Sequence, residues 1–269
     1  MIKRKCPLCN SDRYKELKYY VREFKNCGPR VVRCSLCNLI FLNPVMGGVE
    51  YKYFYDNDGQ KKFVDTAVNE DYFVKLSRQS YRKDLINKYL NKNIRVIDVG
   101  CGYSYFLDSI RNQVKSVCGI EPSVTRANIE RNGIKIFNGN LEDWPHSNSA
   151  DLITMFHVLE HIVDLDRFML HVKRVLCCDG RFVIEVPNHD DILVGLKKYK
   201  WFYYQNAHCS YFNTHTVLYL LKKFGFVIEE QIKIQRYSLS NHLHWFIFGR
   251  PGYIKRLSFL DKLWSWFIK

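Results

Sequence analysis

The chain has 269 residues, of which 47% are hydrophobic, and a formal net charge of +14. This length and hydrophobic content exclude a disordered chain and predict one domain of about 200 residues with a small appendage. No apolar run reaches the roughly 18 residues of a membrane span, and the first residues lack the apolar region of a signal peptide, so we expect a cytoplasmic protein. The positive charge is typical of proteins that bind nucleic acid, a membrane surface or phosphorylated small molecules, and does not choose among them.

Two C-x₂-C pairs stand near the N-terminus, separated by 24 residues: Cys6, Cys9, Cys34 and Cys37. Each pair can present two thiolates from one turn, and two such turns complete a tetrahedron around zinc. Because four protein ligands leave no position for water, we expect a structural zinc site rather than a redox pair. Five further cysteines in apolar surroundings are expected to be small core residues: Cys101, Cys118, Cys177, Cys178 and Cys209.

The sequence divides into four parts. Residues 1–45 form a zinc-binding head that contains a β-hairpin over 29–44, and residues 46–92 form a connector that covers a pocket and ends in a helix over 70–91. Residues 93–250 form the main domain. Residues 251–269 form an amphipathic helix that packs on the domain or on a second subunit of a homodimer, with membrane-surface attachment as the alternative.

Strands and helices alternate along the main domain. Continuous apolar runs predict strands at 94–99, 116–121, 134–138, 151–156 and 181–186. Helices are predicted at 103–113, 123–132, 164–176 and 214–224, and an antiparallel strand pair at 226–234 and 242–249. Apolar strands separated by helices are typical of a parallel sheet covered on both faces, so the fold class is α/β with a doubly wound, mostly parallel sheet.

A turn with two glycines, Gly100 and Gly102, follows the first strand of this sheet. Such a turn lets a nucleotide approach the backbone, and Glu121 at the tip of the next strand can accept hydrogen bonds from both ribose hydroxyls. Asp98 precedes the glycines and is expected to orient the turn or to contact a ligand ammonium through water. A dinucleotide fingerprint needs a third glycine at 105, where Tyr105 stands, and this disfavours NAD.

Five segments in order, IDVGCG, GIEPS, GNLEDW, DLITMFHVLEHI and LCCDGRFVIEVPN, make residues 70–250 resemble the class I S-adenosylmethionine-dependent methyltransferases. The resemblance implies a seven-stranded Rossmann-like sheet and S-adenosylmethionine as the cofactor. One departure is Ser104, where the family often has a further glycine. The implied cofactor contacts are Gly100, Cys101 and Gly102 for methionine and ribose, Glu121 for ribose, Asn140 and Leu141 for adenine, and Phe156 and His157 for the methionine end.

A hydroxyl acceptor must lose a proton, and a histidine suits this role because its pKa lies near working pH. AHCSYF resembles an HxxYF-type element of the family, which implies that His208, as general base, and Tyr211 reach the acceptor pocket. A structural contact near the helix over 214–224 is the alternative for His208. His161 is a second candidate base, and pairing with Glu160 is its structural alternative.

The segment RYSLSNHLHWFIFGRPG resembles stretches in methyltransferases that act on sugars and surface-glycan precursors. Arg236, Asn241 and His242 are therefore candidate substrate contacts, although some of these side chains would face the core of a strand. The head, of the form CPLC…CxxCxLxFLNP, looks like that of methyltransferases from sugar and polysaccharide pathways. It lacks the segment that follows the zinc ligands in zinc-headed guanine methyltransferases of ribosomal RNA.

These features predict an enzyme that O-methylates a small sugar, nucleotide-linked or phosphorylated acceptor in glycan or capsule biosynthesis. Two alternatives stay open. The positive charge favours an RNA methyltransferase with a zinc head, and the Ser104 departure is compatible with a non-enzymatic module for cofactor binding or assembly.

Overall fold

The computed structural model describes residues 1–24, 28–50, 53, 79–123, 133–190, 203–234 and 238–248. Contacts between residues divide the chain into two compact units. The first comprises Met1 and Met46–Val186, and the second comprises Ile2–Val45 and Pro187–Lys269. Residues near the N-terminus therefore share a unit with the C-terminal part of the chain.

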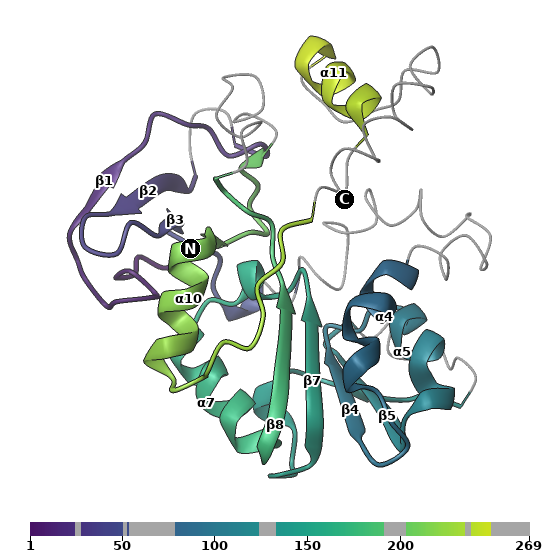
Figure 1. The fold of residues 1–269 in the computed structure, drawn as a ribbon. Helices are drawn as coiled ribbons and strands as arrows, with labels where there is room; N and C mark the ends of the chain where they lie inside the picture. The colour runs from purple at the N-terminus through teal and green to yellow at the C-terminus, as the bar shows by residue number, and fades with distance from the viewer. Residues whose placement is uncertain are drawn as a thin grey trace. The chain divides into compact units, whose positions relative to one another are not determined.

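A parallel sheet of five strands runs through the first unit (Figure 1). The strands are β4 (Arg95–Val99), β5 (Ser116–Glu121), β6 (Lys135–Asn138), β7 (Ala150–Phe156) and β8 (Leu176–Glu185). Their order is β6-β5-β4-β7-β8, and every neighbouring pair is parallel. The order reverses between β4 and β7, which is where doubly wound sheets bind ligands at the strands' carboxyl ends. The predicted α/β fold and its first five strands are confirmed.

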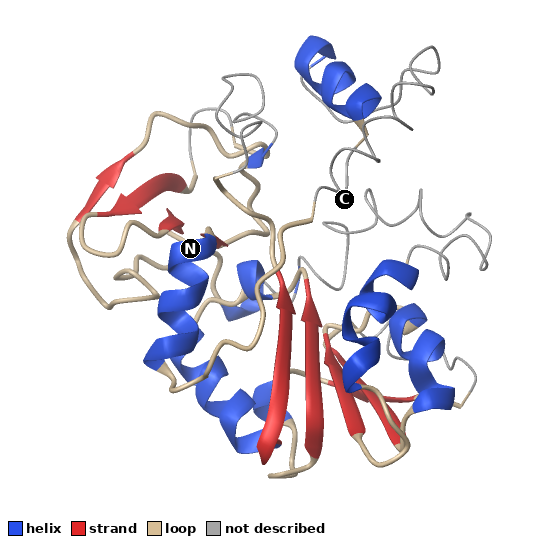
Figure 2. Ribbon diagram, in the orientation of Figure 1, coloured by secondary structure: helices blue, strands red, loops and turns tan. Residues whose placement is uncertain are grey.

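Helices cover both faces of this sheet. Figure 2 shows α4 (Ser80–Ile86) and α5 (Tyr105–Ile110) on one face and α7 (Leu165–Val175) on the other. Ile86, Val96 and Phe106 belong to one buried cluster that joins α4, β4 and α5. The described residues of this unit also form four short 3₁₀ helices: η1 (Asn87–Tyr89), η2 (Arg111–Gln113), η3 (Leu141–Asp143) and η4 (Leu159–His161).

Helix α7 forms as its sequence predicts. Its buried residues are Leu165, Phe168, Met169, Val172 and Val175, which recur at the three- and four-residue spacing of one helix face. Asp164 caps the N-terminus, because its carboxylate accepts a hydrogen bond from the backbone N–H of Arg167 at 3.0 Å. The helix thus buries one apolar face while satisfying one of its terminal N–H groups.

The second unit contains a four-stranded antiparallel sheet and helix α10 (Thr214–Lys223). The strands, in sheet order, are β1 (Tyr14–Glu16), β2 (Arg30–Cys34), β3 (Ile40–Asn43) and β9 (Ser210–Tyr211). The predicted hairpin is confirmed as β2 and β3. The pairing of β9 with β3 was not predicted, and it joins the cysteine-rich head to a segment far along the chain.

Helix α10 is capped and tied to the head. The Asn213 side chain accepts a hydrogen bond from the backbone N–H of Thr216 at 2.9 Å. At the other end, Lys223 Nζ donates to the carbonyl oxygen of Leu8 at 3.0 Å. The head and the C-terminal part of the chain are therefore linked by side-chain contacts as well as by the shared sheet.

The predicted antiparallel pair at the end of the sheet is wrong. Residues 226–234 have no regular secondary structure, and residues 242–249 fall mostly on helix α11 (Leu239–Phe248). The run LHWFIF is apolar throughout, so its pattern fits a strand and a helix equally well. The described residues therefore form five of the seven strands that the family resemblance implies.

The prediction that five isolated cysteines are core residues is partly wrong. Cys101 and Cys209 are buried, Cys118 and Cys177 are partly exposed, and Cys178 is exposed on β8. β8 begins at Leu176 and pairs irregularly with β7 before its regular register starts at Arg181. Cys178 lies in this irregular stretch, where the sheet does not bury it.

Several predicted elements lie outside the described residues. They are the helix over 123–132 beyond Ser123, the covering part of the connector, the lead-in helix before Gln79, and the C-terminal helix over 251–269. Within the described part of the chain, no helix is both long and apolar enough to cross a membrane.

Candidate functional site

The turn after β4 is built on two glycines with left-handed backbone conformations. Gly100 has φ +69° and Gly102 has φ +55°, values that glycine adopts without strain. A Cβ atom at Gly100 would lie 2.3 Å from Val158 Cγ2, whereas a Cβ at Gly102 would meet no atom within 4 Å. Gly100 is therefore required by internal packing, and Gly102 leaves the backbone open to a ligand.

Ser104 preserves the turn although it is not a glycine. It adopts φ +58° as the N-cap residue of α5 and is fully buried. Its N–H donates to the carbonyl oxygen of Cys101 at 3.0 Å, and its own carbonyl accepts from Asp108 N at 2.9 Å. The left-handed conformation explains why glycine is common here, and these bonds hold serine in the same conformation.

Glu121, at the end of β5, links two loops at the carboxyl edge of the sheet. Its Oε2 atom accepts a hydrogen bond from Gly102 N at 2.9 Å, and Oε1 accepts from Ser123 N at 3.1 Å. The side chain is 3% exposed. The carboxylate therefore lies beside the glycine turn, and its orientation is fixed by the protein backbone.

Asp98 is buried at the end of β4, where Thr154 Oγ1 donates to its Oδ1 atom at 2.7 Å. Burial raises the pKa of Asp98 to about 7. The carboxyl group contributes to a pocket at the point where the strand order reverses. This pocket is lined by Gln79, Arg82, Asp98, Gly100, Cys101, Tyr105, Phe106 and Phe156.

A cluster of charged and polar side chains borders this pocket, and all its members except His157 were missed in the sequence. Glu185, at the end of β8, accepts hydrogen bonds of 2.9 Å from Tyr81 Oη and from Arg82 Nε. It also contacts His157 Nε2 at 2.9 Å. Burial opposes ionisation of Glu185, but the contacts with His157 and Arg82 outweigh it and keep the pKa of the carboxyl below its ordinary value. The only sequence signal was a carboxylate within the apolar strand RFVIEV.

His157 is held from three directions. Its backbone is left-handed at φ +58°, and its N–H donates to the carbonyl oxygen of Glu185 at 2.8 Å. Its Nδ1 atom lies 3.5 Å from Glu160 Oε1. Burial favours the neutral ring, but the two carboxylates of Glu160 and Glu185 outweigh it and raise the pKa of His157. The arrangement favours a positively charged imidazolium ring at the end of β7.

The loop after β6 brings Asn140 and Leu141 next to the β5 end. Gly139 N donates to the carbonyl oxygen of Glu121 at 3.3 Å. Asn140 is exposed and caps η3, while its own N–H donates to Asp143 Oδ2 at 3.1 Å. Leu141 is buried at 1% exposure. These residues lie at the same edge of the sheet as Glu121, and their contact with adenine stays a prediction.

The candidate catalytic residues are distributed over both units. His161 ends η4 in the first unit, and His208 and Tyr211 belong to the second. The Nε2 atom of the His208 ring lies 2.7 Å from the Nε2 atom of the Gln205 side chain. Tyr211 is 3% exposed; its hydroxyl accepts from Gln205 N at 2.9 Å and donates to Gln205 O at 3.1 Å. Burial raises the pKa of Tyr211 well above its usual range.

The candidate substrate contacts are only partly described. Arg236 lies outside the described residues. Asn241 and His242 fall on α11 rather than on a strand, and His242 is 6% exposed. On the same helix Ile247 and Phe248 are 55% and 61% exposed. Helix α11 thus buries a polar side chain while exposing apolar ones.

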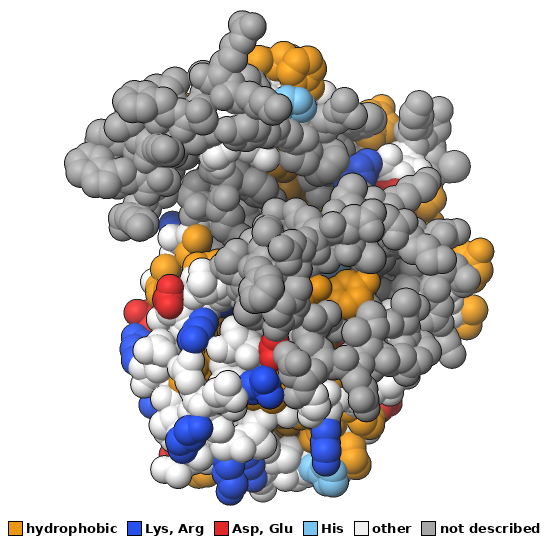
Figure 3. All heavy atoms as spheres, turned by 90° about the vertical axis from the view of Figure 1, so that its right-hand side faces the viewer, with side chains coloured by type: hydrophobic (Ala, Val, Ile, Leu, Met, Phe, Trp, Pro, Cys, Tyr) orange, Lys and Arg blue, Asp and Glu red, His pale blue; other side chains and the backbone are white. Residues whose placement is uncertain are grey.

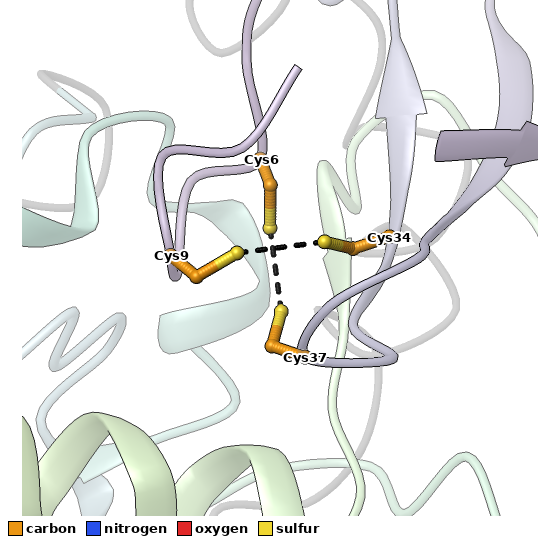
Figure 4. Close-up of side chains that lie close together, drawn as sticks. All are labelled: Cys6, Cys9, Cys34 and Cys37. Carbon is orange, nitrogen blue, oxygen red and sulfur yellow. Dashed lines mark hydrogen bonds between the residues drawn. The ribbon is translucent and has the colours of Figure 1, made fainter. Parts of the chain in front are cut away.

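The four N-terminal cysteines converge in the second unit. Figure 4 shows the side chains of Cys6, Cys9, Cys34 and Cys37 pointing toward one another. Their sulfur atoms all lie within 4.8 Å, with Cys6 to Cys37 at 3.5 Å and Cys9 to Cys34 at 3.4 Å. Zinc–sulfur bonds of about 2.3 Å place the corners of a tetrahedron about 3.8 Å apart. The donor set, spacing and burial are therefore consistent with zinc.

The two halves of this cluster have the same local structure. Asn10 and Asn38 directly follow Cys9 and Cys37, and both adopt left-handed conformations, with φ +58° and +62°. Asparagine tolerates this conformation better than most residues, and it allows the chain to turn sharply after the second cysteine. The hydrogen bond between Cys6 and Cys37 lowers the pKa of the Cys6 thiol, so this pair favours one thiolate.

Basic side chains do not gather into one patch on the face seen in Figure 3, as far as the described residues show. Lys and Arg side chains are spread among polar and hydrophobic groups there.

Comparisons with known proteins are consistent with this geometry. A family model described as "Methyltransferase domain" matches residues 71–231, more than half of the chain. A protein of Mycolicibacterium smegmatis, named as a probable S-adenosylmethionine-dependent methyltransferase, is 32% identical over 97 residues, which cover 35% of this chain and 38% of that protein. The uncharacterized protein MJ1252 of Methanocaldococcus jannaschii is 29% identical over 153 residues, covering 53% and 58%. The chain thus spans less than two thirds of the length of these relatives.

Solved structures are similar to this chain at lower sequence identity. The YcgJ protein of Bacillus subtilis has a TM-score of 0.49 at 19% identity, over 68% of this chain and 82% of that one. A methyltransferase from Archaeoglobus fulgidus that depends on S-adenosylmethionine has a TM-score of 0.46 at 18% identity, over 66% and 90%.

Proposed function

Because this chain belongs to the methyltransferase domain family, we propose that it transfers the methyl group of S-adenosylmethionine to a small acceptor molecule. The observation that carries the proposal is the Gly100–Gly102 turn, which lies beside the Glu121 carboxylate where the strand order reverses. This is the position at which doubly wound sheets bind nucleotides.

The residues that we propose as contacts of the methyl donor lie at this same edge of the sheet. Glu121 accepts hydrogen bonds from the ribose hydroxyls, and Asn140 and Leu141 border the adenine. The turn with Gly100, Cys101 and Gly102 approaches the methionine and ribose part. Phe156 and His157, at the end of β7, meet the methionine end, where Asp98 offers a negative charge to the ammonium group. The position of each residue at the strand ends supports this assignment.

The reaction is an in-line displacement at the donor methyl group. The acceptor oxygen supplies the electron pair of the new C–O bond, the C–S bond breaks with its electrons on sulfur, and S-adenosylhomocysteine leaves. Holding the acceptor oxygen about 3 Å from the methyl carbon accounts for much of the acceleration. The hydroxyl proton passes to a base, and we assign this role to His208, with His161 as the second candidate.

The hydrogen bonds of Tyr211 support a structural role for this tyrosine. Its hydroxyl is committed to the backbone of Gln205, the residue whose side chain contacts His208. Tyr211 would therefore hold the turn that carries the base. This refines the resemblance, in which Tyr211 itself reaches the acceptor.

The acceptor we propose is a sugar, nucleotide-linked or phosphorylated compound of a glycan or capsule pathway. The form of the cysteine-rich head and the segment with Arg236, Asn241 and His242 support it by resemblance, and the net charge of +14 suits a phosphorylated ligand. RNA is the alternative that the same charge favours.

The cysteine cluster is proposed to hold a structural zinc ion. Its four sulfur ligands leave no open position for water, so the metal would stabilise the fold of the second unit rather than take part in the reaction. The cofactors of the protein would then be S-adenosylmethionine and zinc.

Two measurements test the function. Calorimetry should find micromolar binding of S-adenosylhomocysteine, and absence of binding to the folded protein would overturn the proposal. Incubation with labelled S-adenosylmethionine and a panel of nucleotide sugars should label one acceptor class. Labelling of RNA alone would establish the alternative substrate, and labelling of nothing in any cell-extract fraction would favour a non-enzymatic binding module.

The assignment of the base is tested separately once an acceptor is known. His208→Ala should lower turnover by about 10² or more while donor affinity changes only a few-fold, because a general base acts on the acceptor. The matched variant His161→Ala should retain most of its turnover. The reverse pattern would move the base to His161.

A further inference from the structure

We propose that Glu185 is a positioning residue of the donor site, which ties helix α4 to the ends of β7 and β8 and so holds Arg82 over Phe156 at the pocket wall. This inference rests on the proposed function, because it assigns a role toward the methionine end of the donor. Neither Glu185 nor Arg82 stood out in the sequence.

The Glu185 carboxylate collects contacts from two elements. Tyr81 and Arg82 reach it from α4, and His157 reaches it from the end of β7, each at 2.9 Å. Both carboxylate oxygens lie 2.9 Å from Tyr81 Oη. Hydrogen bonds to an ionised acceptor are stronger than neutral ones. One carboxylate therefore fastens a short helix to the strand ends that carry the pocket.

Arg82 is fixed in a defined place by these contacts. Its guanidinium carbon lies 4.4 Å from the centre of the Phe156 ring, within the range of a cation–π contact. Its Nε atom donates to Glu185, and its Nη1 donates to Gln79 Oε1 at 2.9 Å. The Arg82 side chain is 12% exposed, so its charge needs a partner such as Glu185.

Arg82 and two of the residues it contacts line a part of the pocket that also contains the carboxyl group of Asp98. The two residues are Gln79 and Phe156. The methionine end of the donor carries an ammonium and a carboxylate group, whereas the nucleoside end is uncharged. The Arg82 guanidinium suits the carboxylate of the methionine end, and the Asp98 carboxyl group, in its ionised form, suits the ammonium; neither has a charged counterpart on the nucleoside. Displacement of Arg82 should thus weaken binding of the amino-acid part selectively.

The test compares two ligands that differ in this part. S-adenosylhomocysteine contains both ends, and 5′-methylthioadenosine lacks the ammonium and carboxylate groups. In Glu185→Gln we expect the Kd of S-adenosylhomocysteine to rise at least fivefold, while that of 5′-methylthioadenosine changes less than twofold. A purely structural role would change both affinities alike, because it would act through the folded fraction.

Asp151→Asn is the matched control. Asp151 also pairs with an arginine of the sheet unit, since Arg95 Nε lies 2.9 Å from its Oδ2, but it stands near the start of β7 rather than at its carboxyl end. This variant should lower stability without altering either affinity. Tyr81→Phe removes one hydrogen-bond donor to Glu185 and leaves the charge of Glu185 unchanged. It should therefore show the same selective loss of affinity, but a smaller one. This variant keeps the test available if Glu185→Gln does not fold.

The outcomes separate this inference from the proposed function. Equal losses for the two ligands, or no loss, in both the Glu185→Gln and Tyr81→Phe proteins would overturn the positioning role while leaving the function intact. Failure of the wild-type protein to bind either ligand would instead overturn the function, and the positioning role with it.

Discussion

Glu121 accepts a hydrogen bond of 2.9 Å from the backbone N–H of Gly102, so the carboxylate at the end of β5 orders the turn that follows β4. In the proposed complex the same carboxylate meets the ribose. Glu121→Ala should therefore raise the Kd of S-adenosylhomocysteine by about tenfold or more, the effect of losing a hydrogen bond to a charged group. Calorimetry measures this. Asp179→Asn, an exposed carboxylate on β8, is the control, and equal affinity in both variants would contradict the ribose role.

Alanine substitutions at Gly100 and Gly102 should have different effects, the first mainly on folding stability and the second mainly on donor affinity. Alanine in either left-handed position costs about 1–2 kcal/mol, and in Gly100→Ala the new methyl also meets Val158. Gly100→Ala should thus lower the melting temperature more than Gly102→Ala. In Gly102→Ala the methyl meets no protein atom, so the main loss should be in donor affinity. Thermal unfolding and calorimetry on both variants test this. Unchanged donor affinity in Gly102→Ala would show that no ligand approaches that turn.

The sequence predicted the turn and the strands around it because each has a strong local pattern. IRVIDVGCG combines a buried strand with two glycines, and the carboxylate that ends SVCGIE falls at the same sheet edge in any parallel arrangement. Neighbouring patterns are less specific. The apolar run LHWFIF suits a helix or a strand, and the structure has helix α11 there.

Features that depend on contacts between distant segments could not be predicted from the local sequence pattern. β9 is two residues long, and its pairing with β3 joins segments separated by most of the chain. The role of Glu185 depends on the register between β7 and β8, which places it opposite Phe156 and near His157. Local sequence reports neither register nor partner, so Arg82 and Glu185 emerged only from the fold.

The carboxyl group of Asp98 should make donor affinity depend on pH. Burial raises its pKa to about 7, so it is largely protonated at pH 6 and ionised at pH 8. The donor's ammonium group favours the ionised form. The affinity for S-adenosylhomocysteine should therefore increase as pH rises from 6 to 8, by at most about tenfold per pH unit below the pKa, and then level off. Titration calorimetry across this range measures the dependence. Asp98→Asn should bind more weakly and flatten this part of the profile, and an identical profile would contradict the assignment.

The same group should affect the stability of the ligand-free protein in the opposite direction. An acid whose pKa is raised by folding is neutral in the folded state at pH values where the unfolded chain has already lost the proton. Its contribution to the free energy of unfolding is thus fully present below about pH 4 and is lost as pH rises to about 7, by a few kcal/mol at most. Denaturant unfolding of the wild-type and Asp98→Asn proteins between pH 5 and 8 should show a smaller decrease in the variant. A parallel decrease in both proteins would place the titrating group elsewhere.

Zinc content provides the sharpest test of the cysteine cluster. The four sulfur atoms lie within 4.8 Å of one another, and loss of one leaves three ligands, which is too few for a closed structural site. Cys34→Ser should thus reduce zinc from about one ion per chain and lower the melting temperature, because metal binding and folding are coupled. Cys178→Ser, which removes an exposed cysteine outside the cluster, should retain both zinc and stability.

The proposed donor contacts all belong to the first unit, so Cys34→Ser protein that remains folded should bind S-adenosylhomocysteine within about threefold of wild type. Elemental analysis, thermal unfolding and calorimetry on the same samples distinguish the outcomes. Full zinc content in Cys34→Ser would exclude this cluster as the metal site, whereas loss of zinc together with donor binding would mean that the two units depend on each other.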